Sequence, residues 1–289
     1  MQDRSIMAPD LLAAMRWFVA NLSDPAQSPL LMSIDHSPSE QIDGSEWHHS
    51  VLVISQNGEH QALADELGTT LNPSTHTLKQ WKDAKQPYKK HFHQAFFQTL
   101  KDHPVLVLTS SIKESAVIQH EATFADALGI TECYRRMTHN GKSKVEFGPY
   151  TCSDNDALQT LVVSDKHAPM AIHVSHYMLR VHAHLQAAVS ERMGRTDVPV
   201  WFQVMSDKPP NDFIGPYAEL MWLLLGGPTT QGRFTWGGFA GAEDQPIDLL
   251  ADNLAGLMKE ITQSPDLYTY QSSPLQPPIS GVFCWERLE

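Results

Sequence analysis

Short apolar runs separated by amphipathic segments most strongly constrain how this chain can fold. Four runs, at 30–35, 49–55, 104–109 and 198–205, have the length and composition of buried strands. Segments with the helical spacing of apolar residues lie between them, and the longest covers 170–193. Strands that alternate with helices predict an α/β layer fold, in which helices cover a central sheet.

The remaining segments complete this prediction. We expect further helices at 10–22, 61–71, 90–101, 114–128, 217–225 and 247–261, a short strand at 233–239, and an edge strand at 281–285. Residues 131–168 have no strong period and receive no assignment. No repeat, low-complexity linker or clear boundary divides the chain, so we expect a single domain over 1–289, with a proline-rich tail at 264–289.

Composition limits the classes of protein to consider. No apolar run is long enough to cross a bilayer, and the N-terminus lacks the pattern of a signal peptide. Three widely spaced cysteines form no disulfide framework, so we expect a soluble cytoplasmic protein without membrane association. The net charge of −12 disfavours a protein that simply coats nucleic acid. It leaves room for a nuclease, whose carboxylates contribute to that charge.

Four aspartates occupy positions where carboxylates suggest chemistry. Asp35 ends the first apolar run, and Asp207 follows the last one. Asp248 and Asp252 are four residues apart, and therefore lie on one face of the predicted helix. Carboxylates gathered at the ends of buried strands repel one another, and a divalent cation relieves that repulsion. Mg²⁺ or Mn²⁺, held by carboxylates and waters, is the cofactor that this pattern predicts.

Two such ions about 4 Å apart can clamp the attacking and leaving oxygens of a phosphodiester. The expected catalytic residues are therefore Asp35, Asp207 and Asp252, and the expected metal ligands are these three together with Asp248. The 15 histidines form no HExxH or paired Cys/His zinc pattern.

Three short segments carry a resemblance to a known family. They are Ile34-Asp35-His36-Ser37-Pro38, the sequence LLADNLAG at 249–256, and TLKQWKD at 77–83. The chain resembles an RNase H-like family of unknown function found in bacteria and phages. Its first strand ends in D-E-S-G, and its last helix reads roughly Q-L-A-D-L-L-A-G. The resemblance covers about 28–260.

The resemblance implies an RNase H-like mixed sheet flanked by helices, with the strands at 30–35 and 198–205 side by side. It also implies a metal-dependent nuclease that hydrolyses nucleic-acid phosphodiesters with clustered aspartates. Further candidates for the site are His36, Glu121 and Asp83. A metal-facing His36 would favour Mn²⁺ over Mg²⁺. If Asp252 acts only as a metal ligand, Asp252→Asn should leave the stability of the fold unchanged or raise it.

The sequence also supports other interpretations. His36 replaces the family's glutamate and Pro38 its glycine, the pattern of a member whose site has decayed. Such a protein would be an inactive scaffold or binding subunit of a larger bacterial assembly. Each aspartate also has a structural interpretation, as a turn residue, a solvated helix residue or a partner of a helix dipole. A histidine-dependent hydrolase is a third alternative, although no GxSxG motif supports it. Substrate, partner and oligomeric state stay open.

Overall fold

A computed structural model of the chain describes ten segments. They are residues 8–24, 29–40, 44–56, 58–128, 134–152, 155–164, 168–206, 234–236, 245–263 and 283–288.

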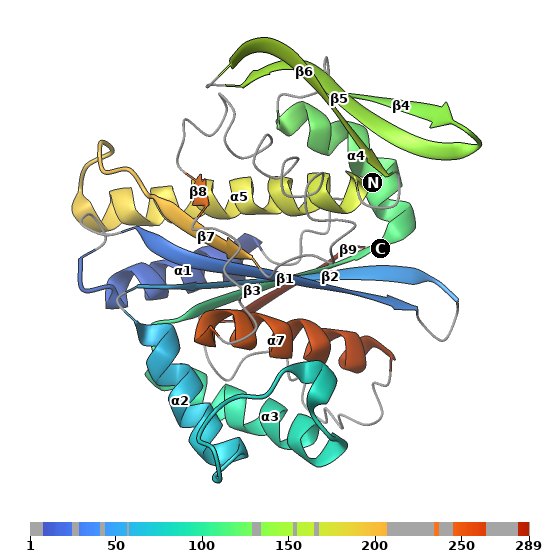
Figure 1. Cartoon of the computed structure of the whole chain (residues 1–289). Helices are drawn as coiled ribbons and strands as arrows, with labels where there is room; N and C mark the ends of the chain where they lie inside the picture. The colour runs from blue at the N-terminus through green and yellow to red at the C-terminus, as the bar shows by residue number, and fades with distance from the viewer. Residues whose placement is uncertain are drawn as a thin grey trace.

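A six-stranded mixed sheet forms the centre of the described structure (Figure 1). Its strand order is β8-β7-β1-β2-β3-β9. The strands are β1 (Leu30–Glu40), β2 (Glu46–Ser55), β3 (Leu106–Lys113), β7 (Phe202–Ser206), β8 (Phe234–Trp236) and β9 (Phe283–Leu288).

Both strand directions occur in this sheet. β1, β2 and β3 form an antiparallel meander, whereas β7 pairs parallel with β1, β8 with β7, and β9 with β3. At the end of β7, Ser206 lies opposite Ile34 of β1. The prediction that the apolar runs at 30–35 and 198–205 are neighbours in the sheet is therefore confirmed.

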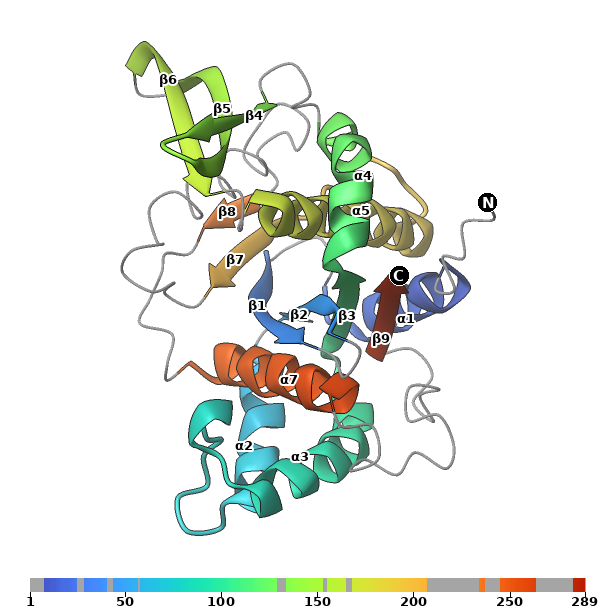
Figure 2. The same ribbon diagram turned by 90° about the vertical axis from the view of Figure 1, so that its right-hand side faces the viewer.

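Helices cover both faces of the sheet (Figures 1 and 2). One face carries α1 (Ala8–Asn21), α4 (Glu114–Ala127) and α5 (Ala168–Met193). The other face carries α2 (Glu59–Leu71), α3 (Gln86–Thr99) and α7 (Pro246–Gln263). The short 3₁₀ helices η1 (Trp81–Asp83) and η2 (Leu100–Asp102) flank α3. The expected mixed α/β architecture is confirmed.

Alternation along the strands explains why the apolar runs are continuous. Met32 and Leu52 are buried under α1 and α5, whereas Val51, Val53 and Val107 are buried under α2, α3 and α7. Successive side chains of a strand point to opposite faces, so a strand covered on both faces is apolar at nearly every position.

Helix α7 packs on the sheet through one apolar stripe. This packing also determines where the aspartate side chains of α7 point. The stripe consists of Ile247, Leu250, Leu254, Leu257 and Ile261, all buried. Asp248 and Asp252 lie at its border, where Asp248 contacts β1 and Asp252 contacts η1.

A second, three-stranded antiparallel sheet forms where the sequence shows no clear period. It consists of β4 (Tyr134–His139), β5 (Lys142–Cys152) and β6 (Asn155–Ser164), in that order. Its Val145 and Phe147 are fully buried in the same core cluster as residues of α4 and α5. Most of its other side chains are polar, so the alternation is too short to be recognised in the sequence.

The C-terminal tail returns to the central sheet. β9 pairs with β3 at the edge, so the prediction of an edge strand near the C-terminus is confirmed. The helix expected at 217–225 lies outside the described residues. No described helix has the length and hydropathy needed to span a membrane.

Candidate functional site

The face of β1 that is covered by α7 carries two of the polar residues of interest. Asp35 is paired with Val51 of β2, which belongs to the core on the α7 side. Cross-strand partners share a face, so Asp35 points to the α7 side, together with Ser33 two residues earlier. Ser33 is fully buried, whereas Asp35 is partly exposed.

Asp248, in the first turn of α7, is held against this face. The residue is 6% exposed, and its carboxylate accepts a short hydrogen bond from the Ser33 hydroxyl. A helix N-terminus favours a negative charge because its free N–H groups and the helix dipole are positive there. Asp248 is therefore fixed on the same face of β1 as Asp35, at a position where an ionised carboxylate is stabilised.

Asp252, one turn further along α7, points towards η1. Its Oδ2 accepts a hydrogen bond from the backbone N–H of Trp81 at 2.6 Å. The phenol of Tyr88 also lies in this region, and its pKa is raised to about 12, mainly by burial. The negative charge of Asp252 adds to that increase, while the hydrogen bond with the Lys79 backbone opposes it.

The other residues of the LADNLAG motif serve the same contact between α7 and the segment around η1. Asn253 is fully buried and donates from Nδ2 to the carbonyl oxygens of Lys79 and Leu249, both at 2.7 Å. Gly256 leaves room for the indole of Trp81, since a Cβ at this position would lie 2.1 Å from Trp81 Cδ1. Two of the segments that carry the family resemblance, LADNLAG and TLKQWKD, are thus packed against each other.

His36 does not share a face with Asp35. Its backbone N–H donates to Asp35 Oδ1 at 2.7 Å, but as the next residue in β1 its side chain points to the α5 side of the sheet. The hypothesis of a metal-facing histidine beside Asp35 therefore finds no support in the strand geometry.

Of the remaining predicted site residues, the two that the structure describes, Glu121 and Asp83, do not lie on this face. Asp207, the residue after the last residue of β7, lies outside the described residues. Glu121 is buried on α4, on the opposite face of the sheet, and forms an ion pair with Arg136 at 2.7 Å. Asp83 is exposed in η1.

One residue on the α7 side was not singled out by the sequence prediction. His49 of β2 is fully buried, and its Nδ1 lies 2.8 Å from the hydroxyl of Ser111 in β3. In the register of β1 and β2 it is a diagonal neighbour of Asp35, on the same face. In the sequence His49 is only the first residue of the apolar run at 49–55, and this pattern gave no indication of its partner.

A second polar cluster lies on the other face of the sheet and includes two histidines of α5. His173 is 2% exposed, and its Nε2 lies 3.1 Å from the Ser110 hydroxyl. The ring of His176 is stacked on the ring of Phe124, with 4.7 Å between the ring centroids. Burial lowers the pKa of His173 to about 3, with further lowering by His176, His48 and Arg180. Burial and Arg180 lower the pKa of His176 to about 4. Both imidazoles are therefore neutral at physiological pH.

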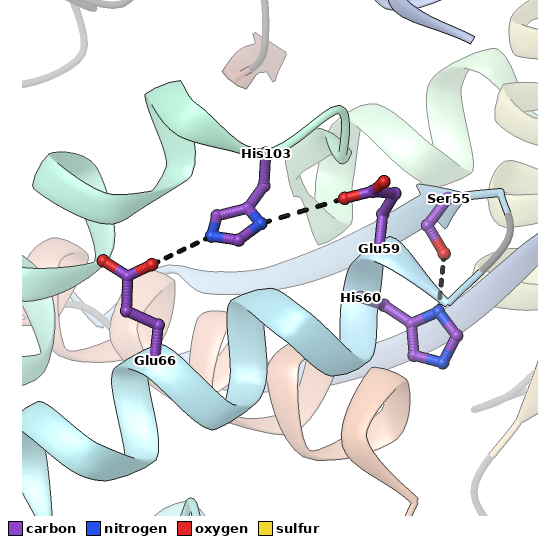
Figure 3. Close-up of polar contacts among 5 residues, drawn as sticks. All are labelled: Ser55, Glu59, His60, Glu66 and His103. Carbon is purple, nitrogen blue, oxygen red and sulfur yellow. Dashed lines mark hydrogen bonds and ion pairs between the residues drawn. The ribbon is translucent and has the colours of Figure 1, made fainter. Parts of the chain in front are cut away.

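A third group of polar residues lies around α2, outside these clusters (Figure 3). His103 lies between Glu66 and Glu59, with Nε2 3.1 Å from one carboxylate and Nδ1 3.9 Å from the other. Because the ring separates the two glutamates, they cannot share one cation. Ser55 and His60 form a separate contact, 2.8 Å between Oγ and Nδ1, that links β2 to α2.

The carboxylate oxygens on the α7 side are ligands of the type that a hard divalent cation prefers. The carboxylates of Asp35 and Asp248 are oxygen ligands of the type that Mg²⁺ and Mn²⁺ accept. Among the described residues, however, no three His, Cys, Asp or Glu side chains come close enough together to hold a metal ion. The sequence prediction also names Asp207, which lies outside the described residues.

Comparison with known proteins identifies no family for this chain. No protein-family model matches it, and neither a curated protein nor a solved structure is similar to it. The functional argument therefore depends on the residues and their geometry.

Proposed function

We propose that the chain is a metal-dependent nuclease-like protein with an RNase H-like fold, which hydrolyses nucleic-acid phosphodiesters. The observation that carries this proposal is the burial of Asp248 against Ser33 of β1, on the face that also carries Asp35. An acidic residue of α7 is thereby fixed on the same face of β1 as the acid of the first strand. The parallel pairing of β1 with β7 supports the same proposal, since RNase H-like folds place these two strands side by side.

In this proposal Asp35, Asp248 and Asp207 would hold the cation. A bound Mg²⁺ or Mn²⁺ would polarise the phosphodiester and lower the pKa of an attacking water. Ser33 orients the Asp248 carboxylate, because its hydroxyl donates to that group from a fully buried position. Asp252 would have a supporting role here, since its Oδ2 is engaged by the Trp81 N–H. This differs from the ligand role expected from the sequence.

An inactive scaffold is the second candidate function, and the same contacts provide a specific reason for it. Both candidate aspartates of α7 have protein donors, Asp248 the Ser33 hydroxyl and Asp252 the Trp81 N–H. Buried carboxylates with hydrogen-bond donors are stable without a metal. Such a protein would keep the fold and serve as a binding subunit of a larger bacterial assembly.

A paired assay separates these two functions. Cleavage of single- and double-stranded DNA and RNA is measured with Mg²⁺, with Mn²⁺ and with EDTA, together with the melting temperature under each condition. The nuclease proposal predicts cation-dependent cleavage that is abolished in Asp35→Asn, and a melting temperature that rises with Mn²⁺ because the ion binds only the folded state. No cleavage and no shift with either cation would instead support the scaffold.

A further inference from the structure

The segment 79–90 is strongly basic, although the chain as a whole is acidic. It contains five lysines and one carboxylate, in a chain of net charge −12. The lysines are Lys79, Lys82, Lys85, Lys89 and Lys90. A local excess of positive charge of this kind creates a positive potential at one place on a negative molecule.

Four of these lysines face solvent, and we refer to Lys79, Lys82, Lys85 and Lys90 as the lysine patch. No ion pair with a described carboxylate holds any of the four in place. Lys89 differs, because its ammonium is 2.6 Å from Glu260 and lies 4.8 Å from the centre of the Trp81 ring. Lys89 therefore stabilises the fold, whereas the lysine patch remains available to an anion.

The lysine patch is attached to the helix that carries the candidate acids. Asp252 accepts the N–H of Trp81, and Asn253 donates to the carbonyl of Lys79. The close approach of Trp81 to Gly256 fixes the same segment further along α7. Figures 1 and 2 both show α3 and the segment before it against α7, on the side away from the sheet. The positions of the lysines relative to α7 are therefore set by the LADNLAG motif.

We infer that the lysine patch is a docking surface for the phosphate backbone of a nucleic acid. The inference rests on the proposed function, since it supplies the contact that brings a polyanion to the acids of α7. An acidic molecule repels nucleic acid, and carboxylates at the site add to that repulsion. Several exposed lysines on the segment packed against α7 offset it, because each phosphate contact releases a condensed counterion.

A lipid surface fits the lysine patch less well than a nucleic acid. Proteins that bind anionic membranes usually combine lysines with exposed apolar side chains that insert among the lipids. The exposed large hydrophobic residues among the described ones are Ile118, Val162, Met193 and Trp201, and none lies in the basic segment.

The test is binding of fluorescent single- and double-stranded oligonucleotides to the full chain, in EDTA so that no cleavage occurs. Anisotropy is recorded at several salt concentrations for wild type and for Lys82→Gln/Lys85→Gln. The control, Arg135→Gln/Lys142→Gln, changes the net charge equally at exposed positions of the second sheet. We expect the dissociation constant of the first variant to be about tenfold higher or more than that of wild type. The slope of log affinity against log salt concentration should decrease in magnitude by roughly 0.7–0.9 for each phosphate that the variant no longer neutralises. The control should change affinity less than about twofold, an effect of net charge at a distance.

Three results would overturn the inference. They are no binding by wild type at low salt, an equal decrease of affinity in both variants, and tighter binding to phosphatidylserine vesicles than to oligonucleotides. Circular dichroism verifies that both variants are folded. Binding that depends on the lysine patch without cleavage under any cation would support this inference and count against the nuclease proposal. Cleavage by wild type together with unchanged binding in Lys82→Gln/Lys85→Gln would support the nuclease proposal and count against the docking role of the lysine patch.

Discussion

Asp252 connects α7 with a backbone N–H that is 171 residues away in the chain. A hydrogen bond to a charged acceptor is worth more than a neutral one, and a backbone N–H left without a partner in a partly buried place is costly. This contact gives Asp252 a structural role, whether or not a cation binds nearby.

Replacing Asp252 should therefore reduce stability according to whether an acceptor remains. We expect Asp252→Ala to lower the free energy of unfolding by about 1–3 kcal/mol, because the Trp81 N–H is left without its acceptor. Asp252→Asn keeps an amide oxygen and should be less destabilising. Urea denaturation measures both, with the exposed Asp83→Ala as control. An increase in stability in Asp252→Asn would show that repulsion among the acids, as first expected from the sequence, outweighs the hydrogen bond.

Two histidines of α5, His173 and His176, make stability depend on pH. The pKa of His173 is lowered to about 3 and that of His176 to about 4, against about 6.5 for an unfolded histidine. As pH falls below about 6.5, the unfolded chain takes up protons that the folded chain does not, so folding becomes less favourable. Above that pH these two residues contribute no pH dependence.

His173→Gln should flatten this acid response. Glutamine can still contact Ser110 but does not titrate, so the unfolding free energy should decrease less between pH 7 and pH 5 than in wild type. The expected difference is on the order of 1 kcal/mol per pH unit below 6.5. Urea denaturation across this range measures the slope, and His91→Gln, at an exposed position, controls for the removal of a histidine. Identical slopes in wild type and His173→Gln would contradict the prediction.

At the scale of whole elements, the contact between α7 and η1 depends on a glycine. A helix interior normally favours alanine over glycine by about 1 kcal/mol. At position 256 the Trp81 indole occupies the place of a Cβ, with three ring atoms within 2.5 Å. Glycine is therefore required for close approach, although it is unfavourable for the helix itself.

Gly256→Ala should consequently destabilise the protein, against the usual helix preference. We expect the free energy of unfolding to fall by about 1–3 kcal/mol, the usual cost of overpacking a core. Trp81→Leu combined with Gly256→Ala should recover part of that decrease, because the smaller side chain leaves room for the methyl group. A double-mutant cycle by thermal or urea denaturation measures the coupling. Additive effects in this cycle would show that the two residues do not compete for space.

At the scale of the whole molecule, the end of the chain closes one edge of the sheet. β9 pairs parallel with β3, whose residues from Leu106 to Ile112 are all buried. Without β9, the backbone N–H and C=O groups along one side of β3 would have no strand partner. Exposed apolar edge strands promote association between molecules.

Deleting residues 283–289 should therefore lower the melting temperature and increase aggregation. Deletion of Glu289 alone is the matched control, since it leaves β9 (Phe283–Leu288) intact. Thermal denaturation and light scattering measure the two effects. A truncated protein that is as stable and as monomeric as the control would show that β9 contributes little to the sheet.

The sequence by itself determined which segments are strands and helices, wherever local periodicity was strong. The four apolar runs became β1, β2, β3 and β7, and the longest amphipathic segment became α5. It also identified LADNLAG and the segment at 77–83, whose importance follows from their contact. These features are local, because they depend on the spacing of apolar residues along one element.

Only the tertiary structure decided which polar side chains meet. Ser33 and Asp248 are 215 residues apart, and no local pattern connects a serine inside an apolar run with an acid on a distant helix. Likewise, β-strand alternation separates Asp35 from His36, but only the packing of α7 and α5 shows what each face contacts. The second sheet was missed for a related reason, since Val145 and Phe147 are stabilised by burial in a core cluster that includes residues of α4 and α5. Such contacts are stabilised by the burial of surfaces from segments that meet only when the chain folds. Local periodicity therefore cannot reveal them.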